Sequence, residues 1–300
     1  PYQLPGGPRL GDQIIAAESN AVCYYNSVVG ARSNKYGDFL DVACALTGKV
    51  PFARLHTDDG RRGRLLIDTS SIPDEFKLED IFYHLLGYAG GRLSGSRVPV
   101  IDGLPRTANR DNLKAASAAL AAAGGVELWH GIGVTPEAPE NGEGFASETR
   151  FELTMNDLAR AREGLTTGRD GQLDMVALGT PHFSLSEFAM LAPLIDGRKV
   201  HDRTKTYVST SRFMRDEAAK RGYLAPLEAA GVEVITDTCT YFTPNVTGCT
   251  GRAMTNAAKW AYYAPGMLGV EVCFGSLAEC AESAVRGEVW RDEKLWRSLT

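Results

Sequence analysis

Short runs of apolar and β-branched residues alternate with helical patterns along this chain of 300 residues. Each apolar run is closed by polar, glycine or proline residues, which is typical of strands that are buried on both faces of a parallel sheet. Parallel strands need crossover connections, and the helical patterns between most of the runs can supply them. The sequence therefore predicts an α/β fold with mainly parallel sheets and crossover helices. The expected strands are Arg64–Asp68, Val98–Ile101, Val126–His130, Asp174–Gly179, Lys205–Ser209, Val232–Thr236 and Val270–Phe274.

Local signals predict where several helices begin. In two places a serine precedes a glutamate by three residues, at Ser184–Glu187 and at Ser276–Glu279. This pattern is a capping box, in which each side chain accepts a hydrogen bond from the other residue's amide. The alanine-rich run Asp111–Ala123 predicts a further helix that is capped by Asp111 and stopped by two glycines. Met254–Trp260 resembles another helix start, with polar groups in its first turn.

A segment rich in proline, glycine and acidic residues runs from Thr135 to Ser147. This composition is typical of a linker, so we expect two subdomains, residues 1–147 and residues 148–300. The chain opens at Pro1 with a loop-like sequence and no methionine, so we expect the first subdomain to be truncated at its start.

Charge and hydropathy exclude several kinds of partner. Acidic residues (37) outnumber basic ones (32), and the two signs are interspersed, for a net charge of -5. No basic stripe is available for a phosphate backbone, so we expect no nucleic-acid partner. Apolar runs such as Met175–Leu178 fall far short of the ~20 residues of a membrane span, and no secretory pattern opens the chain. We expect a cytoplasmic protein with no membrane partner.

Six cysteines in a chain without a secretory signal argue against a disulfide framework. No pair has the C-x-x-C spacing of a metal site, so buried thiols and metal ligands both stay open. Cys239 follows the expected strand Val232–Thr236, and ligands collect at the carboxyl ends of such strands. Cys44 lies in the helical run Phe39–Gly48, where a thiol is usually core filling.

The segment from Glu18 to Asp38 is dense in hydrogen-bonding groups. Arg32 and Lys35 could bind a carboxylate, the first with a bidentate fork and the second as a point charge. The alternative is a loop whose side chains satisfy its own backbone. The candidate substrate-binding residues here are Ser19, Asn26, Arg32, Ser33, Asn34 and Lys35.

Polar residues also follow the expected strands in the second half. His182 lies between a strand and a capped helix, although a lone histidine there is more often structural. Lys259 could help a helix start to hold an anion, although an ordinary solvated lysine is the alternative. Several strand ends with donors suggest one site for a small anionic molecule. The candidates are His182, Ser211, Arg212, Thr255, Asn256 and Lys259.

These segments resemble the aconitase X family over essentially the whole chain. The resemblance rests on Glu18–Val22, Asn26–Arg32, Ala45–Lys49, Thr236–Cys239 and Met254–Trp260. It implies an aconitase-like catalytic domain, with residues 1–147 as its first part and 148–300 as its second α/β subdomain. It also implies a dehydratase whose iron centre lies between this domain and a smaller swivelling domain or subunit.

The resemblance further implies which cysteines are ligands. Cys239 matches the family's Thr-Cys strand end. Cys44 matches a cysteine of the bacterial-type members, which archaeal phosphomevalonate dehydratases replace with alanine. The expected cofactor is an iron–sulfur cluster, with the two-iron two-sulfur type favoured, or a mononuclear iron, held by these two cysteines and a third upstream of Pro1. No ligand position matches the other four, which are Cys23, Cys249, Cys273 and Cys280.

These implications predict an iron-dependent hydro-lyase that acts on a small hydroxy acid. Because Cys44 favours the bacterial-type branch, the expected reaction is dehydration of cis-3-hydroxy-L-proline, through an enamine, to 1-pyrroline-2-carboxylate. The iron would polarise the substrate hydroxyl while Arg32 and Lys35 hold the carboxylate. The base, a serine, is expected on the swivelling domain, so these residues include no named base. The alternatives are a phosphomevalonate dehydratase of the same family and a non-catalytic small-molecule-binding α/β domain.

Overall fold

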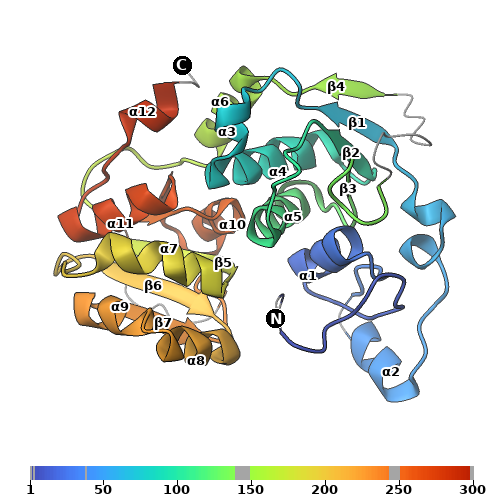
Figure 1. The fold of residues 1–300 in the computed structure, drawn as a ribbon, viewed down its shortest axis with the longest axis horizontal. Coiled ribbons are helices and arrows are strands. Elements are labelled where there is room, and N and C mark those ends of the chain that lie inside the picture. The colour runs from blue at the N-terminus through green and yellow to red at the C-terminus, as the bar shows by residue number, and fades with distance from the viewer. Residues whose placement is uncertain (1, 3, 38, 139–148, 243–250, 298–300) are drawn as a thin grey trace. The chain divides into compact units, whose positions relative to one another are not determined.

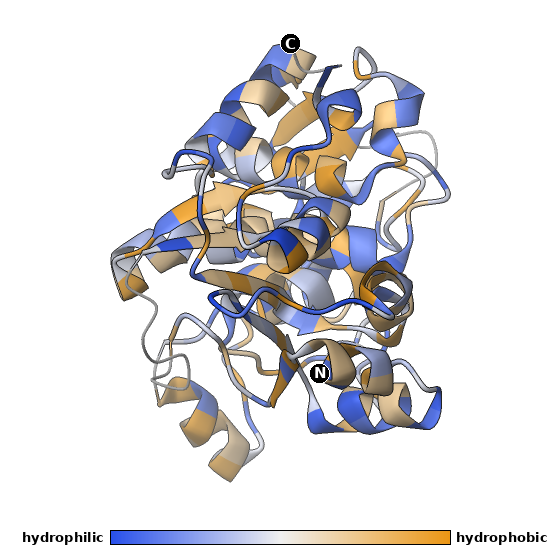
Figure 2. Ribbon diagram, turned by 90° about the vertical axis from the view of Figure 1, so that its left-hand side faces the viewer, coloured by the Kyte–Doolittle hydropathy of each residue, from blue (hydrophilic) through white to orange (hydrophobic). Residues whose placement is uncertain are grey.

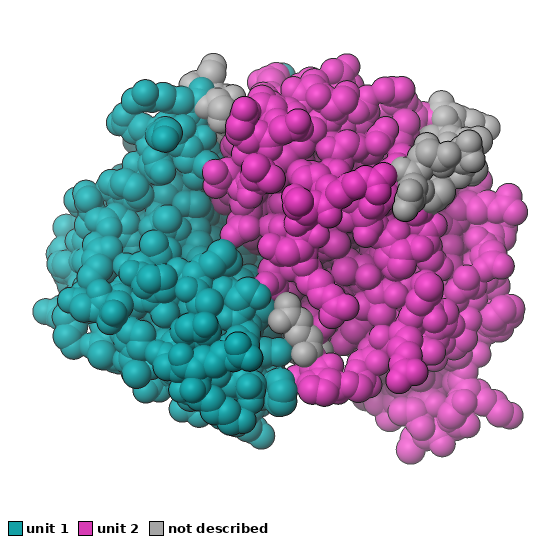
Figure 3. All heavy atoms as spheres, viewed as in Figure 1, with its two compact units in different colours: residues 1, 3, 159–300 teal, residues 2, 4–158 magenta. Residues whose placement is uncertain are grey.

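The computed structural model describes residues 2, 4–37, 39–138, 149–242 and 251–297. The chain forms two compact units (Figure 3): unit 1 contains residues 1, 3 and 159–300, and unit 2 contains residues 2 and 4–158. Each unit has its own parallel sheet with helices. The boundary that we expect between residues 147 and 148 lies outside the described residues, as does most of the expected linker, so that division stays a prediction.

The sheet of unit 2 has the strand order β3-β2-β1-β4, and every described pair in it is parallel. Its strands are β1 (Leu65–Asp68), β2 (Pro99–Asp102), β3 (His130–Gly131) and β4 (Arg150–Glu152). The helices of this part of the chain are α1 (Ser19–Tyr24), α2 (Leu40–Thr47), α3 (Asp74–Lys77), α4 (Asp80–Ser94), α5 (Arg110–Gly124) and α6 (Met155–Gly164), with a π-helical turn η1 (Tyr25–Val29) and 3₁₀ turns η2 (Arg54–His56) and η3 (Asp59–Arg61). Helix α6 crosses the boundary between the units.

Helices α4 and α5 of unit 2 approach each other closely because small residues line their contact. A Cβ atom built on Gly87 of α4 would lie 2.6 Å from the backbone oxygen of Ala116 and 2.6 Å from the Cβ of Ala119. A Cβ on Gly124 would lie 2.0 Å from the backbone oxygen of Gly91. The alanine-rich composition of α5 therefore has a packing purpose as well as a high helix propensity.

The sheet of unit 1 has the strand order β7-β6-β5-β8-β9, again with parallel pairs. Figure 1 labels β5, β6 and β7 of this sheet. Its strands are β5 (Met175–Phe183), β6 (Lys205–Thr210), β7 (Val232–Thr236), β8 (Arg252–Thr255) and β9 (Glu271–Phe274). Its helices are α7 (Leu185–Ile195), α8 (Arg212–Lys220), α9 (Leu224–Ala230), α10 (Ala258–Leu268), α11 (Leu277–Arg286) and α12 (Glu293–Trp296).

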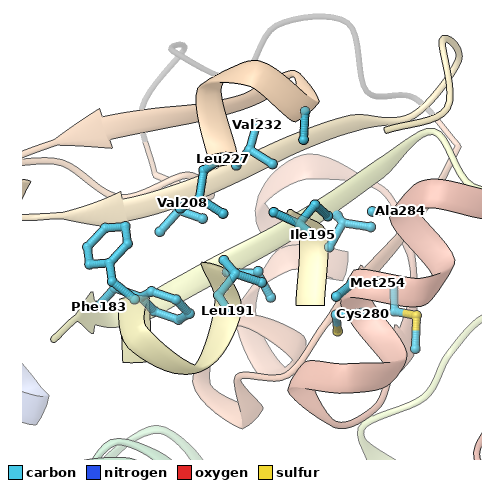
Figure 4. Close-up of a cluster of buried hydrophobic side chains, with 14 of the residues drawn as sticks. Phe183, Leu191, Ile195, Val208, Leu227, Val232, Met254, Cys280 and Ala284 are labelled. Atoms are coloured by element: carbon cyan, nitrogen blue, oxygen red, sulfur yellow. The ribbon is translucent and has the colours of Figure 1, made fainter. Parts of the chain in front are cut away.

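A buried apolar cluster joins this sheet to α7, α8, α9 and α11. Figure 4 shows Phe183, Leu191 and Val208 among the side chains that fill it. Helix α10 contacts β5, β8 and β9 but adds no side chain to the cluster, so it covers the opposite face. Right-handed crossovers place helices on opposite faces when the chain moves in opposite directions along a sheet. Strands that are covered by helices on both faces are largely apolar, and in Figure 2 much of the strand ribbon is coloured tan to orange.

The expected α/β class with mainly parallel sheets is confirmed, and so are most element positions. Ser184 and Ser276 form the predicted capping boxes with Glu187 and Glu279. The helical run that contains Cys44 is α2. Among the described residues, no helix combines the length and the apolar composition that crossing a membrane requires.

Four details differ from the expectations. The run Val126–His130 supplies only the start of β3, because Val126–Trp129 is irregular. The cap of α5 is Asn109, whose side chain accepts from the amides of Asp111 and Asn112, so Asp111 is not the cap. The short strands β4 and β8 carry too few apolar residues to be recognised. The predicted helix start at Met254 is wrong, because Met254 and Thr255 end β8 and α10 begins at Ala258.

Candidate functional site

The strand order of unit 1 reverses between β5 and β8. From β5 the chain crosses to β6 and β7 on one side, whereas β8 and β9 lie on the other side. Ligands of open α/β sheets bind outside the carboxyl ends of the strands at such a reversal, because the adjoining loops diverge there. We call the residues at the carboxyl ends of these strands and just beyond them, 180–184, 209–212, 237–240 and 255–259, the carboxyl edge.

The end of β5 contributes His182 and Thr180 to the carboxyl edge. His182 is partly buried, and its Nε2 lies 3.0 Å from the carbonyl oxygen of Thr238. A carbonyl oxygen only accepts, so this nitrogen carries the proton and donates it. Thr180 is buried, and its hydroxyl has no hydrogen-bond partner among the described residues. A bound ligand with a polar group could satisfy this hydroxyl.

The end of β6 contributes two serines and an arginine. Ser209 is fully buried, and its hydroxyl oxygen also has no hydrogen-bond partner among the described residues. Ser211 caps α8 by accepting from the amide of Met214 at 3.2 Å. Arg212 is mostly exposed, and its guanidinium pairs with Asp237 at 3.1 Å. The expected roles of Ser211 and Arg212 in substrate binding therefore compete with local contacts.

The end of β7 turns sharply to present Cys239. Asp237 has a positive φ of 59°, which is uncommon for a residue with a side chain but is tolerated by aspartate. Cys239 is partly exposed, unlike the other described cysteines, which are buried. Thr240 is fully buried, and its hydroxyl accepts from the indole nitrogen of Trp260 at 2.9 Å. The turn therefore offers a partly accessible thiol at the carboxyl edge.

The end of β8 leads directly into α10. Thr255 is buried, and its hydroxyl accepts from the amide of Ala257 at 3.1 Å. The side-chain oxygen of Asn256 is buried without a hydrogen-bond partner among the described residues. Lys259, with 6% of its surface exposed, lies in the first turn of α10, a helix start that no side chain caps. Helix amides and a lysine together suit a carboxylate.

Unit 1 thus brings a set of the predicted residues to one edge of one sheet. The set comprises His182, Ser211, Arg212, Cys239, Thr255, Asn256 and Lys259.

In unit 2, most of the predicted polar residues bind the protein's own backbone. The Asn26 amide nitrogen donates to the carbonyls of Ser33, at 2.7 Å, and Glu127, at 2.8 Å. The Ser33 hydroxyl donates to the carbonyl of Asn34 at 2.8 Å. The Asn34 side chain bonds the backbone of Ala53 and Leu55. The alternative of a self-satisfying loop therefore describes these three side chains well.

The remaining predicted residues of unit 2 differ in how far they are engaged. Arg32 has 21% of its side chain exposed and lies 2.6 Å from Asp58 and 3.6 Å from Glu137. Lys35 is exposed, its backbone amide donates to the Glu127 carboxylate at 3.2 Å, and its backbone forms a β-bridge with Ala16. Ser19 lies next to Glu18, the residue that caps α1.

Sequence reasoning missed a buried polar cluster beside Arg32. His56 is fully buried between the hydroxyl of Tyr36 and the side-chain oxygen of Gln13. Burial lowers the pKa of His56, and the charges of Arg61 and Arg32 lower it further. No local spacing signals this cluster, because its members come from distant segments of the chain.

The five described cysteines divide into two groups. Burial raises the pKa of the Cys23 thiol to about 12 and that of Cys273 to about 11, and it raises the pKa of Cys280 well above the ordinary value. A metal binds the thiolate, so these three positions disfavour metal binding. Cys44 and Cys239 remain. Cys249 lies outside the described residues.

Cys44 is the one buried residue of α2, whose other side chains are at least partly exposed. It belongs to unit 2 and Cys239 to unit 1, so the convergence of their sulfurs on one iron stays a prediction. Among the described residues, no group of three or more histidine, cysteine, aspartate and glutamate side chains is arranged to hold a metal ion.

Three family models match consecutive parts of this chain. Residues 1–59 match the Aconitase X first domain, residues 63–163 the Aconitase X second domain, and residues 173–286 the Aconitase X third domain.

Curated relatives agree with these matches. The cis-3-hydroxy-L-proline dehydratase of Pseudomonas aeruginosa is 44% identical, over 99% of this chain and 52% of its own length. The protein of the same name from Hypocrea jecorina is 40% identical, over 96% of this chain and 49% of its own length. The phosphomevalonate dehydratase large subunit of Methanocaldococcus jannaschii is 32% identical, over 93% of this chain and 69% of its own length. The chain therefore spans about half the length of the first two relatives.

A solved structure shows the same fold. The crystal structure of Thermococcus kodakaraensis aconitase X in its holo-form matches with a TM-score of 0.83 and 29% sequence identity. The match covers 95% of this chain and 71% of the other.

Proposed function

This chain belongs to the aconitase X family, and we propose that it is part of a hydro-lyase that removes water from a small hydroxy acid. The observation that carries the proposal is the carboxyl edge of unit 1. At that edge a buried lysine at a helix start follows β8, beside the reversal of strand order, and a partly exposed thiol follows β7, the outer strand on the other side of β5. His182, at the end of β5, reaches the residue before this thiol with a hydrogen bond of 3.0 Å. A small anionic substrate and a soft metal are the ligands that these groups suit.

We propose cis-3-hydroxy-L-proline as the substrate and 1-pyrroline-2-carboxylate as the product. The relatives from Pseudomonas aeruginosa and Hypocrea jecorina bear the name of this dehydratase and share more of the sequence than the archaeal large subunits do. Phosphomevalonate would also need cations for its phosphate. Of the described cations at the carboxyl edge, Arg212 is already paired with Asp237.

The proposed cofactor is iron, as an iron–sulfur cluster or a mononuclear ion. Cys44 and Cys239 would be the soft sulfur donors of such a centre, and burial raises the pKa of the Cys23, Cys273 and Cys280 thiols, which disfavours those three as ligands. Two thiolates do not complete an iron–sulfur site, so further ligands are required. When bound, the iron would supply a Lewis acid that makes the substrate hydroxyl a better leaving group.

The chain's own residues would bind and orient the substrate. Lys259 and the first amides of α10 would hold the carboxylate, and their positive charge would stabilise the negative charge that develops there when the Cα proton leaves. Asn256 would bind a polar group of the ring with its buried side-chain oxygen, which suits the ammonium of proline. The proton-abstracting serine is proposed to lie on the swivelling domain or subunit of the family.

A reducing compartment suits this proposal, because no disulfide joins the five described cysteines. We therefore propose a cytoplasmic location.

Full-length protein, purified without oxygen, tests the proposed function. Iron and sulfide are assayed chemically, and the protein is then incubated separately with cis-3-hydroxy-L-proline and phosphomevalonate. We expect bound iron and the NMR signals of 1-pyrroline-2-carboxylate. Turnover of phosphomevalonate but not of cis-3-hydroxy-L-proline would show that phosphomevalonate is the substrate. Binding of either compound without turnover would favour a non-catalytic domain.

A further inference from the structure

The four residues Asp237–Thr240, which we call the Cys239 turn, are fixed by three other parts of unit 1. The ties come from the end of β5, from the junction of β6 with α8, and from α10. Such multiple anchoring is unusual for a surface turn, because turns at strand ends are commonly among the less restrained segments of a fold.

Asp237 ties the turn to β6 and α8. Its amide donates to the carbonyl of Thr210 at 2.9 Å. Its carboxylate accepts from the amide of Arg212 at 3.0 Å and pairs with the Arg212 guanidinium at 3.1 Å. The backbone amide and the side-chain carboxylate of Asp237 therefore both bond the segment at the end of β6.

The backbone of Asp237 explains why the chain can turn here. Its φ of 59° lies in the left-handed region, which aspartate and asparagine tolerate better than other residues with a side chain. This conformation follows directly after the last residue of β7, so it redirects the chain and places Cys239 two residues later.

His182 and Trp260 tie the other half of the turn. The Nε2 of His182 donates to the carbonyl of Thr238 at 3.0 Å, on the residue just before the cysteine. The indole of Trp260, which is fully buried, donates to the Thr240 hydroxyl at 2.9 Å, on the residue just after it. Cys239 is thus flanked on both sides by anchored residues while its own side chain stays partly exposed.

We infer that His182 and Asp237 are positioning residues that hold the Cys239 turn in the conformation required of a metal ligand. This inference rests on the proposed role of Cys239, and it gives His182 a different task from the substrate binding expected from the sequence. A ligand held in place before the metal arrives binds it more tightly, because no ordering of the loop is needed at that moment.

The test measures how readily the Cys239 turn opens in full-length protein from which metal has been removed. The rate at which iodoacetamide alkylates each cysteine is followed by mass spectrometry. His182→Leu removes the donor, and His182→Gln restores an amide N–H at a similar reach. We expect the Cys239 rate to rise about fivefold in His182→Leu, as the loss of one hydrogen bond implies, and to return close to wild type in His182→Gln. The Cys44 rate should not change.

A second series separates the side chain of Asp237 from its backbone. Asp237→Asn keeps an acceptor for the Arg212 amide and tolerates the positive φ, so its Cys239 rate should stay within about twofold of wild type. Asp237→Gly relieves the φ but removes the acceptor, so its rate should rise about fivefold. His201→Leu, elsewhere in unit 1, is the matched control and should change neither the alkylation rate of Cys239 nor that of Cys44.

Iron release supplies a second readout on the loaded protein. With a chelator in excess, His182→Leu and Asp237→Gly should lose iron several-fold faster than wild type, and the thermal midpoint identifies any variant that is simply unfolded. Equal alkylation and release rates in folded His182→Leu, His182→Gln and wild type would overturn the inference. A wild-type protein without iron or turnover would instead refute the proposed function, and the alkylation rates would still report on the turn.

Discussion

Lys259 is the residue on which substrate affinity should depend most. It is buried in the first turn of α10, at the reversal of strand order, where a carboxylate would meet both its charge and the helix amides. Replacing Lys259 with methionine keeps the length and removes the charge, so we expect kcat/KM for the hydroxy acid to fall about a hundredfold. Steady-state kinetics measure this, with Lys220→Met, a mostly exposed position on α8, as the control that leaves kcat/KM unchanged.

The two groups of cysteines should respond in opposite ways to serine. Cys280→Ser puts a hydroxyl into the apolar cluster of unit 1, so it should lower the free energy of unfolding by about 1–3 kcal/mol and leave the iron content unchanged. Cys239→Ser should lower the iron content and leave stability within about 0.5 kcal/mol. Denaturant unfolding and an iron assay measure both quantities. Loss of iron in Cys280→Ser but not in Cys239→Ser would show that Cys280, and not Cys239, is the iron ligand.

His84 should make unit 2 sensitive to acid. Burial, with a smaller contribution from the charge of Lys114, lowers the pKa of His84 from 6.5 to about 3. The unfolded chain therefore binds a proton more readily than the folded one, so the stability that neutral His84 provides is present above pH 6.5 and is lost as the pH falls toward 3. The slope should be about 1.4 kcal/mol per pH unit. Denaturant unfolding of His84→Asn from pH 7 to pH 4 should show a shallower slope than wild type, and equal slopes would contradict this.

At the scale of elements, one substitution in two helices should have opposite effects. Gly87→Ala in α4 places a Cβ 2.6 Å from the backbone of α5, so it should cost about 2 kcal/mol through overpacking. Gly266→Ala in α10 meets nothing within 4 Å, so it should stabilise the protein by about 0.5–1 kcal/mol through helix propensity. The free energies of unfolding by denaturant test both predictions. A loss of stability at both positions would show that the space around the added Cβ does not determine the sign of the effect.

Elements with local signals could be predicted from the sequence, and those that depend on distant partners could not. The capping serine of α7 is recognisable because Ser184 and Glu187 satisfy each other within one turn. Strand β8 cannot be recognised from the sequence, because four residues with an arginine and a threonine lack a clear apolar pattern, and Met254–Trp260 instead resembles a helix start.

The candidate site follows the same division. Cys239 and His182 could be placed at strand ends because the carboxyl ends of parallel strands share one edge. The bond between His182 and Thr238 could not be predicted, because it depends on the register of β5, β6 and β7. Substrate binding by Asn26 and Asn34 stays a prediction. Their side-chain amides donate to the carbonyls of Glu127 and Ala53, and the local sequence does not reveal these contacts because both partners lie in other segments.

At the scale of the whole molecule, turnover should require more than residues 1–300. If the swivelling domain carries the serine base, as proposed, these residues alone should bind the hydroxy acid without dehydrating it. Adding the domain in cis or in trans should restore product formation, measured by NMR. Replacing its serine with alanine should abolish the loss of the Cα proton and leave the iron content intact. Sustained dehydration by residues 1–300 alone would place the base in this chain.

The reversal of strand order in unit 1 also bears on how such enzymes can diverge. The loops of the carboxyl edge contribute little to the apolar cluster between the sheet and its helices. Substitutions in these loops can therefore accumulate at small cost to folding, while the strands and their crossings stay under constraint. One scaffold can thus be inherited by lineages that process chemically different acids, and new specificities can arise by exchange of a few short connections.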